Sequence, residues 1–180
     1  MDLDMYIQKK WTALFKFANF SQTGKFTFAE AMEYPVQLLR AGKVEHAFVL
    51  ARAYKKHWDS ILEALDKPKD EASVGQDDWV KAQTIVSKQD WYLRELIPTA
   101  TMAFIDIMDI DKDGTVSFEE WRNYYTMQGV KSEEFIRSTF AKMDSNNDGV
   151  ISRKEFEHAL KVYNSRHEPG NDYSFLYTLD

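Results

Sequence analysis

Apolar side chains recur every three or four residues along most of this chain, which is the spacing of one face of an α-helix. In the first segment this stripe comprises Ile7, Trp11, Leu14, Phe15 and Ala18. The same spacing predicts further helices at about 28–40, 44–65, 77–93, 98–108, 118–128, 133–143 and 153–164. No segment shows the strict alternation of a half-buried strand, so the pattern predicts an all-α protein.

Two prolines bear on the ends of these helices. Pro35 predicts a kink or an end within the helix at 28–40, because a proline inside a helix removes a hydrogen-bond donor. Pro98 instead suits a first helical turn, where the missing N–H has no partner to lose. The layout is a helix, a short loop and a helix, repeated along the chain.

Loop signals divide the chain unevenly. The most loop-like stretch is 66–76, and residues 165–180 form a tail that contains Pro169 and Gly170. No low-complexity linker separates two halves. We therefore expect two lobes pressed into one compact body.

The segment 109–120 carries the strongest chemical signal. Oxygen-bearing side chains stand at its positions 1, 3, 5, 9 and 12, which are Asp109, Asp111, Asp113, Ser117 and Glu120. Calcium is a hard cation that takes six to eight oxygen ligands, and carboxylates at alternate positions converge as a chain curls round it. Gly114 permits the sharp turn, Thr115 offers its backbone carbonyl, and Ser117 acts through a water. Glu120 closes the site with both oxygens.

A second segment, 144–155, repeats this pattern 35 residues later. Its candidate ligands are Asp144, Asn146, Asp148, Val150 (through its carbonyl), Ser152 and Glu155, so it has three ligand carboxylates where the first has four. A cluster of Asp and Gly between helices is usually an ordinary turn. Two full matches, each with an apolar residue at position 8 (Val116 and Ile151), favour two calcium sites instead. Crowded carboxylates repel one another, so we expect ion binding to be coupled to folding of the C-terminal half.

A third loop, 19–30, is degenerate. It keeps Gly24 at position 6 and Glu30 at position 12, but positions 1, 3 and 5 are Asn, Ser and Thr. Glu30 is then the single full negative charge. We expect a loop that keeps its geometry and its pairing, and we do not expect a third ion at Asn19–Glu30.

A fourth loop, counted back from Asp78, is further from the pattern. Lys67 and Lys69 fall at positions 1 and 3, and Ala72 replaces the turn glycine. Cations at ligand positions predict a loop that binds no metal. Val74 at position 8 can still pair with Phe26 of the preceding loop.

Composition narrows the function classes. The 180 residues carry a net charge of −6, which leaves no basic surplus for the phosphates of nucleic acid. No cysteine is present, so neither disulfides nor thiolate metal sites are available. The N-terminus shows no signal-peptide pattern, and no apolar run reaches the ~18 residues of a membrane span. We expect a cytoplasmic monomer without a transmembrane segment.

The two loops and the four helix-loop-helix units resemble the EF-hand superfamily. Softer features are similar to the sarcoplasmic calcium-binding protein and calexcitin group, which is related to coelenterazine-binding proteins and photoproteins: the opening Tyr6–Lys10, the Asp77-Asp78-Trp79 segment and the ending Phe175–Leu179. The resemblance implies an all-α fold of four EF-hand units, arranged as two pairs in a compact globule with short β-bridges between paired loops. The pairs take residues 1–95 and 96–180.

The resemblance also implies an intracellular buffer of calcium, with magnesium competing for the same sites. The alternative is a sensor that exposes an apolar groove to a target protein, as calcium does in calmodulin-like proteins. The scattered methionines favour core filling over a groove, and the missing linker favours the buffer.

Two other classes have less support. The five tryptophans could line a cavity for an aromatic ligand, as in a coelenterazine-binding protein or photoprotein, but no Trp lies between His158 and Tyr163. Catalysis is not expected, because the histidines (His46, His57, His158 and His167) are dispersed and no phosphate loop, nucleophile elbow or zinc motif is present.

Overall fold

The computed structural model describes residues 3–19 and 21–165. The N-terminal half contains α1 (Leu3–Ala18), α2 (Phe28–Ala31), α3 (Glu33–Arg40), α4 (Val44–Ala64) and α5 (Gln76–Val86). The C-terminal half contains the π-helix η1 (Tyr92–Leu96), α6 (Ile97–Met108), α7 (Phe118–Met127), α8 (Glu133–Met143) and α9 (Arg153–Ser165). Apart from Ser165, the predicted tail with His167 and Phe175–Leu179 lies outside the described residues.

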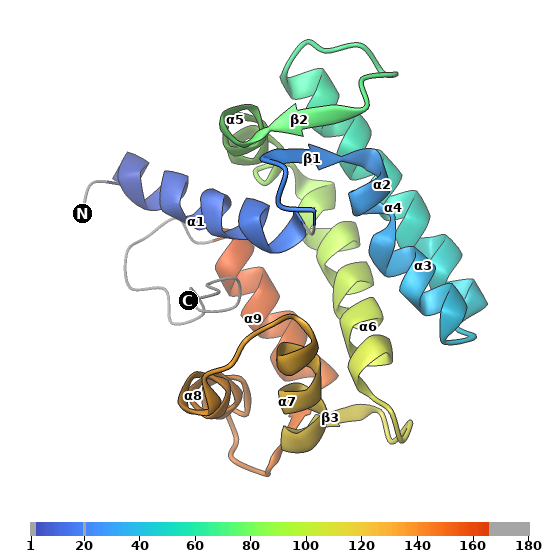
Figure 1. Cartoon of the computed structure of the whole chain (residues 1–180), viewed down its shortest axis with the longest axis vertical. Helices are drawn as coiled ribbons and strands as arrows, with labels where there is room; N and C mark the ends of the chain where they lie inside the picture. Colours follow the sequence, from blue (N-terminus) through green and yellow to red (C-terminus); the bar gives the residue numbers. More distant parts are fainter. Residues whose placement is uncertain (1–2, 20, 166–180) are drawn as a thin grey trace.

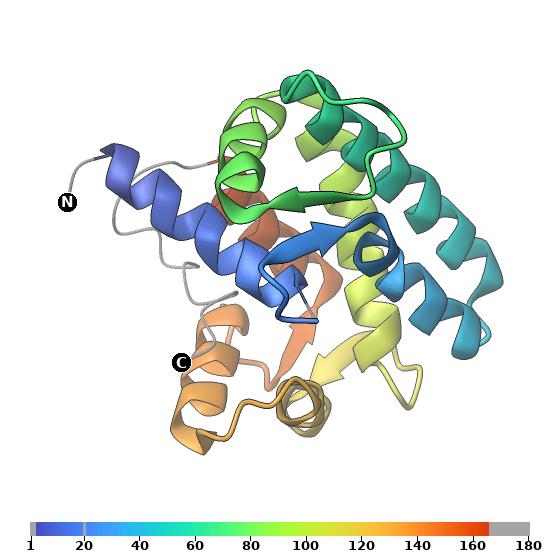
Figure 2. The same ribbon diagram turned by 45° about the horizontal axis from the view of Figure 1, so that its top comes forward.

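Four three-residue strands join the loops in two antiparallel pairs. β1 (Lys25–Thr27) pairs with β2 (Ser73–Gly75), and β3 (Thr115–Ser117) pairs with β4 (Val150–Ser152). The register puts Phe26 opposite Val74, and Val116 opposite Ile151. This confirms the predicted fold class, a mostly helical protein with short β-bridges between paired loops. Figure 2 shows β1 lying alongside β2.

The predicted break near Pro35 is present, three residues before the proline. The helical segment at 28–40 breaks at Met32, which is both the C-cap of α2 and the N-cap of α3. Pro35 is the third residue of α3, in its first turn. A proline is tolerated there because the first N–H groups of a helix have no intrahelical partner.

The predicted helix at 77–93 is too long. α5 ends at Val86, and a turn follows before the helical run that includes η1 and α6. Pro98 is near the start of α6 as predicted, yet the chain enters α6 directly from the π-helix. Pro98 has no backbone N–H to donate to the preceding helical turn, and the wide π turn lies at this point of the chain.

α6 connects the two halves of the molecule. It packs against α3 and α4 on one side and against α9 and α7 on the other (Figure 1). The most buried large side chains include Trp11 and Phe15 of α1, Trp121 of α7 and Tyr163 of α9. The buried side chains form one cluster that includes members of both halves. The expected division at residue 95 falls within η1 and stays a prediction.

Among the described residues, none of the helices combines the length and the apolar character that a membrane crossing requires.

Candidate metal centres

The four loops between these helices are numbered in chain order: loop I is 19–30, loop II is 67–78, loop III is 109–120 and loop IV is 144–155. Loop III begins at the end of α6, where Asp109 is the C-cap, and ends inside α7. Ser117 is the N-cap of α7, and Glu120 is its third residue.

Ser117 and Glu120 form a capping box. The Ser117 hydroxyl accepts a hydrogen bond from the Glu120 N–H (3.4 Å), and Glu120 Oε2 accepts one from the Ser117 N–H (2.9 Å). Loop positions 9 and 12 are therefore also the two residues that start α7. Formation of the helix places the closing carboxylate.

The start of loop III is curled by its first aspartate. Asp109 Oδ1 accepts from the Asp113 N–H (3.1 Å), and Oδ2 accepts from the Gly114 N–H (3.0 Å). The turn needs positive φ at Lys112 (65°) and at Gly114 (89°). Glycine adopts such a φ without steric cost, which explains the glycine at position 6.

Carboxylates crowd the centre of loop III. Ligand atoms of Asp109, Asp111 and Glu120 lie within 4.8 Å of one another. The pKa of Asp111 is raised, because the lowering effect of its bond from the Asp113 N–H is outweighed by desolvation and by its negative neighbours. A divalent cation would relieve this repulsion, and a set of carboxylate oxygens suits a hard ion such as calcium.

Glu120 is nevertheless held in its ionised form. Burial raises its pKa, but hydrogen bonds from Ser117, Ile110 and Asp111 lower it further, so the net pKa lies below the ordinary value. The Ile110 N–H donates to Glu120 Oε1 at 2.7 Å. These hydrogen bonds orient the closing carboxylate and favour its charged form.

Loop IV repeats this construction with one fewer carboxylate. Asp144 accepts from the Asp148 and Gly149 N–H groups (both 3.0 Å), and Glu155 Oε2 accepts from the Ser152 N–H (2.9 Å). Asn146 donates from its amide to Asp148 Oδ2 (2.8 Å). Hydrogen bonds from Ser152 and its neighbours outweigh burial and lower the pKa of Glu155.

The pairing of β3 with β4 couples loops III and IV. Val116 and Ile151, at position 8 of each loop, are fully buried and opposite each other. A change in the backbone of one loop would therefore shift the backbone of the other.

The structure brings Asp109, Asp111 and Glu120 together, as predicted. The hydroxyls of Ser117 and Ser152 donate to the closing glutamates, at 2.8 Å and 2.7 Å. The predicted contact of each hydroxyl with an ion, through a water molecule, would compete with its hydrogen bond to the glutamate. Coordination by the twelve residues stays a prediction.

Two histidines that have no role in the sequence patterns have partners in the structure. His46 contacts the buried carboxylate of Asp106, which also pairs with Lys43 (3.2 Å). His57 hydrogen-bonds Gln83 (3.0 Å). These partners lie 26 or more residues apart in the chain, so helical spacing carries no signal for them.

Gln83 continues a buried chain of polar side chains. It donates to the Tyr92 hydroxyl (2.6 Å), which donates to Asn164 on α9 (3.1 Å). The chain links α5, the π-helix and the last described helix, so it ties the two halves together.

Comparisons with known proteins agree with this geometry. Residues 106–161 match the family model of the EF-hand domain pair. The mitochondrial substrate carrier family protein C of Dictyostelium discoideum is 32% identical over 62 residues, which cover 34% of this chain and 12% of that protein. The shared region is thus a small part of that carrier, and its transport activity does not follow for this chain.

Solved structures share the fold along most of the chain. The calcium-loaded apo form of the coelenterazine-binding protein from Renilla muelleri has a TM-score of 0.65 at 17% identity, with 97% of this chain and 96% of that chain covered. Calcium-loaded apo-aequorin from Aequorea victoria has a TM-score of 0.66 at 18% identity, covering 87% and 89%. A calcium-binding protein of Streptomyces coelicolor has a TM-score of 0.62 at 19% identity, covering 88% and 98%.

At these identities the neighbours show the fold alone. The matched domain pair contains both loops with a full set of candidate ligands, and the fold extends the same architecture to loops I and II. Residues 106–161 of this chain are therefore an EF-hand domain pair, and this part of the chain carries the candidate calcium ligands of loops III and IV.

Proposed function

We propose that this protein is a cytoplasmic, monomeric buffer that holds two calcium ions, one in loop III and one in loop IV, with magnesium competing for both. The ligands are the twelve residues named from the sequence. The proposal rests on the capping boxes that orient Glu120 and Glu155, and on the crowded carboxylates of loop III. No catalytic step belongs to it.

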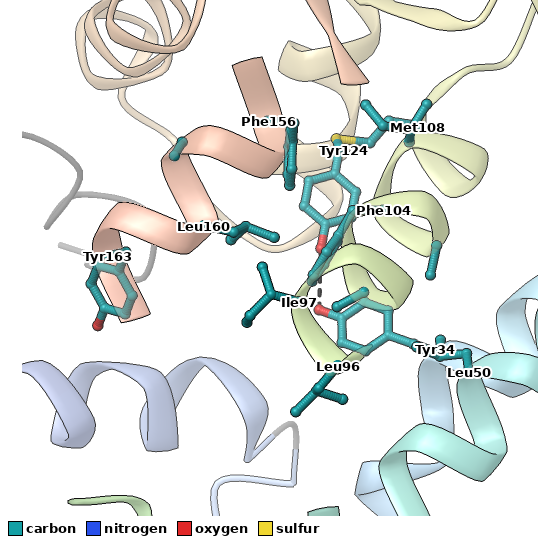
Figure 3. Close-up of a cluster of buried hydrophobic side chains, with 14 of the residues drawn as sticks. Tyr34, Leu50, Leu96, Ile97, Phe104, Met108, Tyr124, Phe156, Leu160 and Tyr163 are labelled. Carbon is teal, nitrogen blue, oxygen red and sulfur yellow. Dashed lines mark hydrogen bonds between the residues drawn. The ribbon is translucent and has the colours of Figure 1, made fainter. Parts of the chain in front are cut away.

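One observation favours a buffer over a sensor. A sensor must expose an apolar groove for its target, whereas here the N-terminal half covers the interior face of the C-terminal pair. The ring of Tyr34, from α3, lies 5.0 Å from that of Phe104, and its hydroxyl lies 3.1 Å from that of Tyr124 (Figure 3). Phe156 and Leu160 of α9 belong to the same cluster. The groove is already filled by the protein's own aromatic side chains.

The test combines calorimetry with a fluorescent dye that binds apolar surface, starting from magnesium-loaded protein. A buffer takes up two calcium ions per chain with little rise in dye fluorescence. A Glu120→Gln, Glu155→Gln variant supplies the control in which calcium uptake is lost. A large rise in dye fluorescence that requires both glutamates would overturn the buffer and favour the sensor.

The sensor remains the first alternative because apolar side chains are exposed on α4. Val44 and Phe48 lie one helical turn apart and are 51% and 65% exposed. In the dye experiment, Phe48→Ser separates this surface from an opened groove. If Phe48→Ser lowers the dye signal and calcium causes no further rise, the dye binds the exposed surface of α4, and the exposure of that surface does not depend on calcium.

A second candidate function rests on a partly open cavity of about 100 Å³. Aromatic residues of both halves line it, including Tyr54, Trp58, Trp79 and Tyr92, and His57 adds a polar group. Sites for drug-sized ligands measure about 300 Å³ or more, so the cavity is small for a coelenterazine-like molecule. Incubation with coelenterazine and calcium tests this candidate. A bound chromophore or emitted light would support it, and the absence of both would mean that the aromatic residues serve as core.

A further inference from the structure

Loop I has the backbone of a calcium loop without the charges of one. Its positions 4 and 6, Gln22 and Gly24, have positive φ of 54° and 75°. The same positions of loop III, Lys112 and Gly114, have 65° and 89°. Repulsion between carboxylates is absent from loop I, because Glu30 is its one full negative charge. Some other interaction must hold its oxygens together.

The side chain of Asn19, at position 1, supplies that interaction. The oxygen and nitrogen of its buried amide are assigned from the neighbouring groups, because in the opposite orientation the oxygen faces only acceptors and the nitrogen only donors. In the orientation that satisfies both, the oxygen accepts from the Gly24 N–H (3.1 Å), as Asp109 does from Gly114 in loop III. The amide nitrogen then donates toward three oxygens, Lys25 O (3.3 Å), Ser21 Oγ (3.1 Å) and Glu30 Oε1 (3.0 Å).

These three acceptors are at loop positions 7, 3 and 12. In a calcium loop, those positions supply oxygens to the ion. The nitrogen of Asn19 therefore contacts the oxygens that a cation would contact. Glu30 is completed by the Ser21 N–H (3.0 Å) and the Thr27 N–H (2.9 Å), which match the bonds to Glu120 in loop III.

Loop II uses a nitrogen at the same position. Lys67, at position 1, places its ammonium 3.1 Å from Asp78 Oδ2, at position 12. The ion pair joins the beginning of the loop to its end, which is the closure that a bound ion and a closing carboxylate would provide in loops III and IV. The pair is partly exposed, so solvent screens the attraction between its two charges.

We propose that loops I and II are each closed by a nitrogen of their own chain at position 1, in place of a metal ion, so that the N-terminal pair keeps its folded geometry without calcium. The core beneath the loops agrees with a preformed pair. Phe26 of β1 packs on Trp79 (4.6 Å between rings), and Val74 of β2 is buried opposite Phe26. The ion-dependent part of the molecule is then confined to loops III and IV.

Hydrogen exchange of the full chain tests the proposal, with peptides that cover each loop followed in chelator and in calcium. Peptides of loops I and II should keep the same protection in both conditions, while those of loops III and IV gain protection with calcium. A calcium-dependent gain in loop I or II would overturn the inference. Unchanged loops III and IV would instead overturn the proposed function, so the two failures are distinguishable.

Variants probe the nitrogen itself. Asn19→Asp replaces the donor by a carboxylate facing Glu30, and should lower the protection of loop I in chelator about tenfold or more, with recovery on adding calcium. Gln22→Glu adds the same charge to an exposed position of the same loop while keeping the nitrogen, and should leave protection unchanged. Equal effects of the two changes would refute a role for the Asn19 nitrogen. Lys67→Met should lower the protection of loop II in chelator by a smaller factor, because the ion pair with Asp78 is partly exposed.

Discussion

Replacing Glu120 by glutamine tests whether loop III closes on a divalent cation. The amide keeps the size of the side chain but removes one unit of charge. It also replaces one acceptor oxygen by a donor nitrogen. Both oxygens of Glu120 accept hydrogen bonds, from Ile110 (2.7 Å) and Ser117 (2.9 Å), so one of these bonds is lost. Both losses act on the same side chain.

The magnitude follows from Coulomb's law. A ligand oxygen lies about 2.4 Å from a bound calcium ion. Loss of a unit charge at that distance from a doubly charged ion costs about 3 kcal/mol even with the dielectric constant of water. That free energy corresponds to more than about a hundredfold in Kd. Since β3 and β4 join the loops, a smaller loss is expected in loop IV.

The assay is a calorimetric titration of metal-free protein with calcium. Glu119→Gln is the matched control, because Glu119 is the adjacent residue on α7, is exposed, and pairs with Arg122 at 2.7 Å. An exposed ion pair contributes little, so the control should change Kd by about twofold or less. Equal calcium affinities in the two variants would refute the ligand assignment for loop III.

Three further predictions follow from the structure. Tyr34→Phe or Tyr124→Phe should lower the free energy of unfolding by about 1–2 kcal/mol, since each leaves a buried hydroxyl without this partner, and a double-mutant cycle should give a coupling of about 1 kcal/mol; additive losses would contradict a direct bond. Burial lowers the pKa of His57 to about 4, partly opposed by a side-chain hydrogen bond, so folding favours the neutral ring. The contribution of His57 to the free energy of unfolding is complete above its unfolded pKa of about 6.5 and is lost as pH falls toward about 4. Urea unfolding should therefore show a free energy of unfolding that is lower by about 2 kcal/mol at about pH 5 than at about pH 7, and this difference should be absent in His57→Gln. Gly114→Ala should cost about 1 kcal/mol through its positive φ and also weaken calcium binding, whereas Gly42→Ala, with φ of 76° outside the loops, should cost similar stability with unchanged calcium affinity; equal calcium affinities in both variants would contradict the turn argument.

The sequence predicted where helices lie more accurately than where they end. Pro35 correctly indicated a break, which falls at Met32, so the proline lies in the first turn of α3. Apolar spacing continued past Val86, although α5 ends there. Periodicity reports which face a helix buries and says little about where it stops, because ends depend on caps and on packing against other elements.

The sequence by itself determined how loops III and IV curl, because the groups that curl each loop lie within its own twelve residues. The carboxylates, the glycine at position 6 and the capping residue before α7 act on their own neighbours. The same reasoning correctly predicted the pairing of Phe26 with Val74 and the short β-bridges between paired loops, since position 8 is apolar in all four loops.

Only the tertiary structure decided what surrounds the loops. The contact of Tyr34 with Tyr124 joins residues 90 apart, and the bond between Tyr92 and Asn164 joins residues 72 apart. Such contacts leave no periodic trace in the chain, because they join α3 to α7 and η1 to α9, which are far apart in the sequence and meet only in the packed fold.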